Sequence, residues 1–158
     1  MKHSPSLLIA EYLAACLIGI ILLPCLVFIA LLCAKTNGEI KWMLPIATGA
    51  AVPLLGLVLL KGCSIKVKWL ALGLFILAMT NALWVASWFY DPTWDSRAYH
   101  ADGILLLLAG NNPFYDKMQW FDDLWTNHYP KITWYYAALL THLTDNYNLG
   151  KSLSLIHI

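Results

Sequence analysis

Charge is scarce in this chain of 158 residues: 12% of its side chains are charged and 60% are hydrophobic. A soluble domain usually carries about a quarter charged residues, so an ordinary soluble protein is excluded. The net charge is +1 and no basic run is present, so the electrostatic footprint of a nucleic-acid-binding protein is missing. The composition predicts an all-α, polytopic membrane protein that contacts membrane lipids and binds no nucleic acid.

Cysteine is also sparse, and the spacing of the four cysteines fits neither a metal site nor a disulfide framework. Cys16, Cys25 and Cys33 fall in an apolar run, where we expect them to be buried as small hydrophobic residues. Cys63 lies in a short lysine-rich loop. No cofactor is required by any motif, and no ligand cluster demands a divalent metal, although a metal stays open.

Three apolar stretches have the length of about 20 residues that a membrane-spanning helix needs. They predict spans over residues 13–33, 42–60 and 69–89, with Glu11 at the boundary of the first. The first apolar run is too long for the hydrophobic region of a cleaved signal peptide, which has about 7–15 residues. The third span ends in an aromatic cluster typical of a membrane interface: Trp84, Trp88, Phe89 and Tyr90.

The lysines predict the orientation of these spans. A cytoplasmic N-terminus places four lysines inside and two in the first outer loop: Lys2, Lys61, Lys66 and Lys68 against Lys35 and Lys41. The positive-inside rule favours this arrangement. We therefore expect a bacterial inner (plasma) membrane protein in which residues 91–131 form an extracytoplasmic loop.

Acidic residues become frequent only after the third predicted span. Before residue 91 the only acids are Glu11 and Glu39, and seven aspartates follow. Residues 94–109 are predicted to form an interfacial helix, closed by Gly110 and an Asn-Asn-Pro breaker. Residues 132–152 begin with an apolar stretch too short to span a membrane, which predicts an interfacial or broken membrane helix.

The last six residues, 153–158, match the translation of a transposon end used in a common sequencing-library preparation. We interpret them as an adapter artefact, so that the chain represents an N-terminal fragment of a longer reading frame. On this interpretation His157 has no functional meaning.

Three short motifs follow the spans in order: Asp95 with Tyr99 and His100, then residues 110–114 (Gly-Asn-Asn-Pro-Phe), then residues 128–131 (His-Tyr-Pro-Lys). In their order and position they resemble the GT-C superfamily of membrane glycosyltransferases, such as the protein O-mannosyltransferases and the aminoarabinose transferases. Here the acidic loop follows the third span instead of the first, and Tyr-Pro-Lys stands in place of Tyr-Pro-Pro. The resemblance implies transfer of a sugar from a polyprenyl-phosphate donor to an extracytoplasmic glycan, lipid or protein, with inversion.

Such a transfer needs a carboxylate base for the acceptor hydroxyl and groups that stabilise a leaving phosphate. We predict Asp95 as the catalytic base and Arg97, the only arginine, as a bidentate phosphate ligand. Further substrate-binding candidates are Tyr99, His100, His128 and Lys131, with Asp91 and Asp102 as secondary candidates.

Structural alternatives stand beside these roles. Asp95 and Asp91 could cap a helix, and Asp102 could face solvent or pair with Arg97. The residues at 111–113 are expected to act chiefly as a helix stop, and His142 is expected at the surface. The rival functions are a non-enzymatic membrane anchor or subunit and a transporter or flippase. A transporter needs polar residues within its spans, where this chain offers little: Thr48, Thr80 and Asn81.

Overall fold

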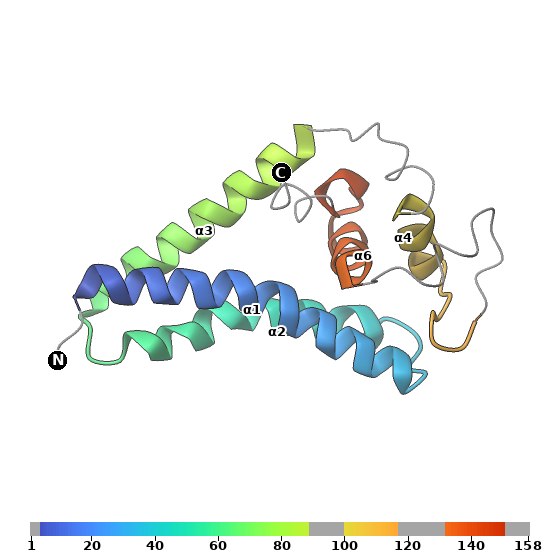
Figure 1. Cartoon of the computed structure of the whole chain (residues 1–158), viewed down its shortest axis with the longest axis horizontal. Coiled ribbons are helices and arrows are strands. Elements are labelled where there is room, and N and C mark those ends of the chain that lie inside the picture. Colours follow the sequence, from blue (N-terminus) through green and yellow to red (C-terminus); the bar gives the residue numbers. More distant parts are fainter. Residues whose placement is uncertain (1–3, 89–99, 117–131, 151–158) are drawn as a thin grey trace.

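The computed structural model describes residues 4–88, 100–116 and 132–150, and these parts are helical, with no strand among them. In chain order the helices are α1 (Pro5–Cys33), α2 (Ile40–Gly56), the 3₁₀ helix η1 (Leu57–Leu60), α3 (Ile65–Trp88), α4 (Ala101–Leu108) and α6 (Ile132–Thr144). Figure 1 shows α1 and α2 side by side, α3 leaving them at an angle, and α4 and α6 together beside the other half of the pair.

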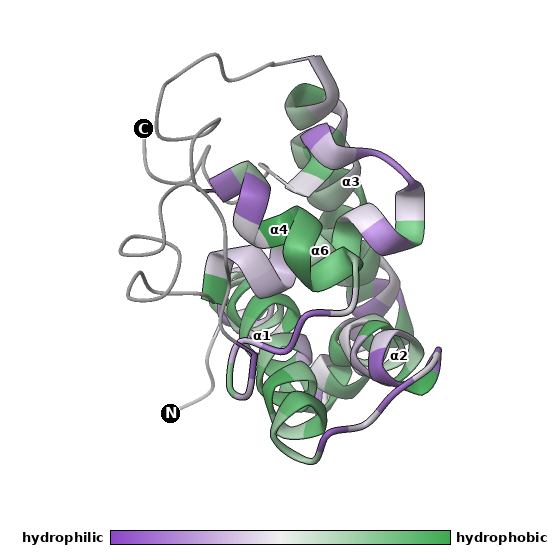
Figure 2. Ribbon diagram, turned by 90° about the vertical axis from the view of Figure 1, so that its right-hand side faces the viewer, coloured by the Kyte–Doolittle hydropathy of each residue, from purple (hydrophilic) through white to green (hydrophobic). Residues whose placement is uncertain are grey.

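Three of these helices are long and apolar enough to cross a membrane: Pro5–Cys33, Ile40–Leu60 and Ile65–Trp88. Their outward faces carry large apolar side chains such as Ile18, Leu55 and Leu77, and Figure 2 shows that hydrophobic residues predominate along these helices. Such a surface is stable in lipid and not in water. The prediction of an all-α protein embedded in a membrane is therefore confirmed at this level.

All three helices begin before the spans that the hydrophobic pattern predicts, and serine caps start two of them. The Leu7 backbone N–H donates to Ser4 Oγ at 3.3 Å, and Pro5 occupies the first turn of α1. The Val67 N–H donates to Ser64 Oγ at 3.5 Å at the start of α3. As a result α1 begins at Pro5, and Glu11 lies inside this helix, exposed, and not at its boundary.

Small residues let α1 and α2 approach closely. A Cβ placed on Gly19 would lie 2.9 Å from Val52 Cγ1, and one on Gly56 would lie 2.7 Å from Cys16 Sγ. Both distances are too short for real atoms, so a larger residue at either position would force the facing side chain to shift. Close backbone approach at small residues is the usual basis of helix pairing in lipid.

A side-chain hydrogen bond repairs the end of α2. At the change from α-helix to 3₁₀ helix the Leu57 N–H bonds to the Leu54 carbonyl, leaving the Pro53 carbonyl without its usual partner. The buried Tyr12 hydroxyl of α1 donates to this oxygen at 3.0 Å. An unpaired carbonyl in lipid costs several kcal/mol, so this bond stabilises both the pair and the break in α2.

The helices form two separate buried clusters along α1. One joins α1, α2 and α3 around Tyr12, Cys16 and Phe75. The other joins the C-terminal half of α1 with α2, α4 and α6 around Phe28, Trp42 and Trp134. Within the described chain α6 ends at Thr144, where Asp145 has a positive φ of 52°, and a 3₁₀ turn over residues 147–150 follows.

Candidate functional site

The structure places two of the predicted site residues, His100 and Asp102, on or next to α4. The others lie outside the described residues: Asp91, Asp95, Arg97, Tyr99, His128 and Lys131. Of the helix predicted over residues 94–109, the described part is Ala101–Leu108, and His100 before it already has helical dihedral angles, φ −70° and ψ −43°.

The predicted stop after this helix is confirmed and has a specific geometry. The Gly110 N–H bonds to the Leu107 carbonyl at 3.1 Å, and the Asn111 N–H to the Leu106 carbonyl at 3.0 Å. Gly110 has φ +97°, a conformation that glycine adopts without strain. These two backbone hydrogen bonds form a Schellman motif.

His100 is joined to α6 by a hydrogen bond between two rings. The Trp134 Nε1–H donates to His100 Nδ1 at 2.6 Å, with the ring planes at 83°. Trp134 is 1% exposed. A Cβ on Gly103, one turn along α4, would lie 2.5 Å from the indole ring, so the ring rests directly on the α4 backbone.

Asp102 lies on another face of α4. Two positions along a helix are about 200° apart, so Asp102 and His100 point in different directions. The half-buried Asp102 lines a shallow hollow of about 200 Å³ with Leu105, Leu106 and Ala109. The two described site candidates are therefore held on one helix but do not converge on one point.

The residues after α4 cap the C-terminus of α1, which the sequence did not predict. Asn112 Nδ2 donates to the Leu32 carbonyl at 2.7 Å, and the Tyr115 hydroxyl donates to the Cys33 carbonyl at 2.7 Å. Lys35, in the left-handed region at φ 54°, places Nζ 4.3 Å from the centre of the Tyr115 ring. This turn therefore fixes α4 at the end of the helix bundle that carries the α1–α2 connection.

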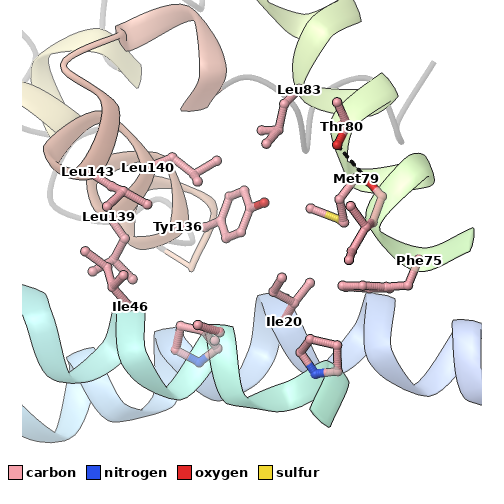
Figure 3. A pocket seen from close by; sticks show the side chains of 15 residues that line it. Ile20, Ile46, Phe75, Met79, Thr80, Leu83, Tyr136, Leu139, Leu140 and Leu143 are labelled. Carbon is pink, nitrogen blue, oxygen red and sulfur yellow. Dashed lines mark hydrogen bonds between the residues drawn. The ribbon is translucent and has the colours of Figure 1, made fainter. Parts of the chain in front are cut away.

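Three consecutive aromatic residues of α6 face three different neighbours. Trp134 contacts α4, and Tyr135 packs edge-on against Phe28 of α1 with ring centres 5.7 Å apart. Burial raises the pKa of the Tyr135 hydroxyl to about 12, so this group stays neutral. Tyr136 lines a cavity on the opposite side of α6 from α4 (Figure 3).

That cavity has a volume of about 360 Å³ and is lined by α1, α2, α3 and α6. Figure 3 shows Tyr136 and Met79 on either side of it, with Leu83 above and Ile20 below. Its lining is apolar except for the Tyr136 and Thr80 hydroxyl groups: Ile20, Pro24, Ile46, Gly49, Ala50, Pro53, Phe75, Ile76, Met79, Thr80, Leu83, Tyr136, Leu139, Leu140 and Leu143. It is lined by three membrane-spanning helices and α6, and Figure 1 shows α3 leaving the α1–α2 pair at an angle.

Polar side chains within the spans bond to their own helices. The Thr48 hydroxyl donates to the Leu44 carbonyl at 2.7 Å and the Thr80 hydroxyl to the Ile76 carbonyl at 2.8 Å. Asn81 Nδ2 donates to the Leu77 carbonyl at 2.9 Å. The donors of these three side chains are therefore satisfied within their own helices.

Two expectations about single residues were wrong. His142 is only 28% exposed: it stacks on Trp42 with ring centres 4.6 Å apart, and its Nε2 lies 3.3 Å from Glu39 Oε2. Cys33 is exposed at the end of α1, whereas Cys16 and Cys25 are buried as predicted. Cys33 is the last residue of α1, so no further turn of this helix covers its side chain.

Trp134, Tyr115 and Lys35 were not predicted from the sequence as residues of this site. The available signal for Trp134 was Gly103, one turn after His100 and inside an otherwise apolar helix, where a glycine indicates close packing.

Within residues 4–88, 100–116 and 132–150 no group of three His, Cys, Asp or Glu side chains could hold a metal ion. In comparisons with protein families, curated proteins and solved structures, no match to this chain was found.

Proposed function

We propose that this chain is part of a membrane glycosyltransferase that moves a sugar from a polyprenyl-phosphate donor to an extracytoplasmic acceptor. The observation that carries the proposal is the apolar cavity of about 360 Å³ between α3 and α6. A donor with a long hydrocarbon chain needs such a space at membrane depth, beside a polar segment that meets its phosphate.

The arrangement of the helix ends supports the proposal. The turn after α4 contacts the end of α1, next to the α1–α2 connection. The loop that carries Lys61 lies at the other end of the same helices (Figure 1). If this lysine-rich loop is cytoplasmic, the turn after α4 is at the extracytoplasmic side, where the acceptor would be.

In the proposed reaction the acceptor hydroxyl oxygen attacks the anomeric carbon of the donor sugar. The bond from this carbon to the phosphate oxygen breaks, and the lipid phosphate leaves with the electron pair. Asp95 takes the hydroxyl proton, and Arg97 stabilises the leaving phosphate by charge and paired hydrogen bonds. Attack from the side opposite the phosphate inverts the anomeric centre.

The role of Asp95 is tested by Asp95→Asn in the uninterrupted reading frame. Loss of a general base lowers kcat by about 10²–10⁴-fold, measured as transfer of labelled sugar in vesicles. Asp145→Asn is the matched control, because Asp145 is exposed after α6 and asparagine tolerates its positive φ of 52°. Full activity of Asp95→Asn at normal expression would remove the base assignment and favour an anchor or subunit.

The cavity is tested separately, with a larger side chain on its wall. Ala47 and Ala50 of α2 are both exposed, but of the two only Ala50 lines the cavity. We expect Ala50→Phe to raise the KM for the polyprenyl donor several-fold with little change in kcat, as loss of uniform binding does. An equal effect of Ala47→Phe would show that the cavity does not hold the donor chain.

A further inference from the structure

The hydrogen bond between Trp134 and His100 determines where the imidazole proton lies. An indole N–H can only donate, so the nitrogen that faces it, His100 Nδ1 at 2.6 Å, must carry a lone pair and no proton. A histidine with an unprotonated Nδ1 is neutral and holds its proton on Nε2. A doubly protonated ring would place two N–H groups against each other.

Packing keeps the indole in this position. Trp134 is 1% exposed, and the α4 backbone at Gly103 lies so close beneath its ring that a Cβ there would come within 2.5 Å. His100 and Gly103 are three positions apart and so lie on the same face of α4. Gly103 of α4 therefore supports the indole ring, and His100, directly before α4, accepts the hydrogen bond from its N–H.

We propose that Trp134 is a positioning residue that holds His100 as a neutral hydrogen-bond donor through Nε2. In this state His100 contributes a directed N–H group to an anionic oxygen, and neither a base at Nδ1 nor a positive charge. This inference rests on the proposed function, in which that oxygen belongs to the phosphate of the polyprenyl donor. Trp134 therefore acts on the substrate only through His100.

The tautomer is tested first, without any assay of transfer. The chain is labelled with ¹⁵N in its Trp and His rings, placed in lipid, and studied at about pH 8, above the usual pKa of histidine of about 6.5. We expect an unprotonated Nδ1 at His100 and a scalar coupling across the hydrogen bond to Trp134 Nε1. A protonated Nδ1, or no coupling, would overturn the proposal even if no variant folds.

The variants then separate the hydrogen bond from packing. Trp134→Phe keeps an aromatic ring on Gly103 but removes the donor, so His100 should populate both tautomers. Trp42→Phe is the matched control, because Trp42 is also buried, at 5% exposed, but stacks on His142. A His100 spectrum unchanged by Trp134→Phe, or changed as much by Trp42→Phe, would contradict a specific role of Trp134.

The phosphate is tested by adding a polyprenyl phosphate to the vesicles. We expect the His100 Nε2 resonance to shift, and no shift with the corresponding polyprenol. In the uninterrupted protein Trp134→Phe should lower kcat/KM by at least about tenfold, the value of a hydrogen bond to a charged group, and add nothing to His100→Ala. Additive losses would overturn action through His100.

These outcomes separate the two proposals. If Asp95→Asn retains transfer while the ring coupling is present, the base assignment fails and the tautomer stands. If polyprenyl phosphate leaves the His100 resonances unchanged, the phosphate-binding role fails, whatever Asp95 does.

Discussion

The two halves of α1 are packed by different means. Its N-terminal half contacts α2 closely at Gly19 and Cys16. The Tyr12 hydroxyl adds a hydrogen bond from α1 to the Pro53 carbonyl of α2. Its C-terminal half contacts aromatic rings of α2 and α6 and receives hydrogen bonds from Asn112 and Tyr115. One continuous helix of 29 residues thus joins a tightly paired membrane region to a polar, aromatic end.

The surroundings explain this difference. In lipid, apolar side chains gain little by moving from hydrocarbon onto another helix, so pairing depends on close contact of backbones. Near a membrane interface, aromatic rings with polar groups are stable and helix ends have free carbonyls to satisfy. The N-terminal half of α1 is therefore held by close helix packing, and its C-terminal half lies where polar and aromatic groups gather.

The largest expected effect comes from widening the α1–α2 contact. A Cβ on Gly49 would lie 2.9 Å from Pro24 Cγ, whose ring cannot rotate away. We expect Gly49→Val to destabilise the protein by about 3 kcal/mol, at the upper end for overpacking. Gly73→Val is the matched control in α3, since nothing lies within 4 Å of a Cβ there.

The measurement is the free energy of unfolding in bicelles, taken as the difference between the two glycine variants so that helix propensity cancels. Equal stability of Gly49→Val and Gly73→Val would show that α1 and α2 are not paired through their backbones.

An intermediate effect is expected where α4 meets α6, beside the aromatic C-terminal end of α1. A Cβ on Gly103 would lie 2.5–2.8 Å from three atoms of the Trp134 ring. Gly103→Ala should therefore cost about 2 kcal/mol by overpacking and move Trp134 away from His100. Leu105→Ala, at an exposed position of the same helix, should leave the Trp134 fluorescence and its shielding from a soluble quencher unchanged.

If Gly103→Ala leaves Trp134 as well shielded as before, the indole does not rest on α4. The aromatic half of the molecule would then lack the packing of Trp134 on Gly103 that joins α6 to α4.

The sequence predicted the membrane-spanning part well, because long apolar runs have few alternatives in a folded chain. It misplaced the starts of α1 and α3, since hydropathy does not detect the serine caps at Ser4 and Ser64. The stop at Gly110 was predictable from turn chemistry, which acts over a few residues.

The tertiary contacts of the site were not predictable from the sequence. The bonds from Asn112 and Tyr115 to α1 join positions 80 and 82 residues apart, and no local pattern reports a pairing at that separation. His142 was misjudged for the same reason, because only the fold brings Trp42 and Glu39 to it. A role for a side chain can be guessed from its chemistry, but its partner comes from packing.

The smallest expected effect concerns the cap on α1. Asn112→Ala removes the bond to the Leu32 carbonyl and the bond that Asn112 Oδ1 accepts from the Phe114 N–H at 3.1 Å, at a cost of about 1 kcal/mol. Asn112→Asp keeps that acceptor but sets a carboxylate against the Leu32 carbonyl. Asn112→Asp should therefore be at least as destabilising as Asn112→Ala. If only the local bond from the Phe114 N–H mattered, Asn112→Asp would be the more stable of the two variants. Hydrogen exchange at the Thr36 N–H, bonded to the Leu31 carbonyl at 2.9 Å, should become faster in both variants. If Asn112→Asp is as stable as the unmodified chain, the turn does not hold the end of α1, and the two halves of that helix are independent.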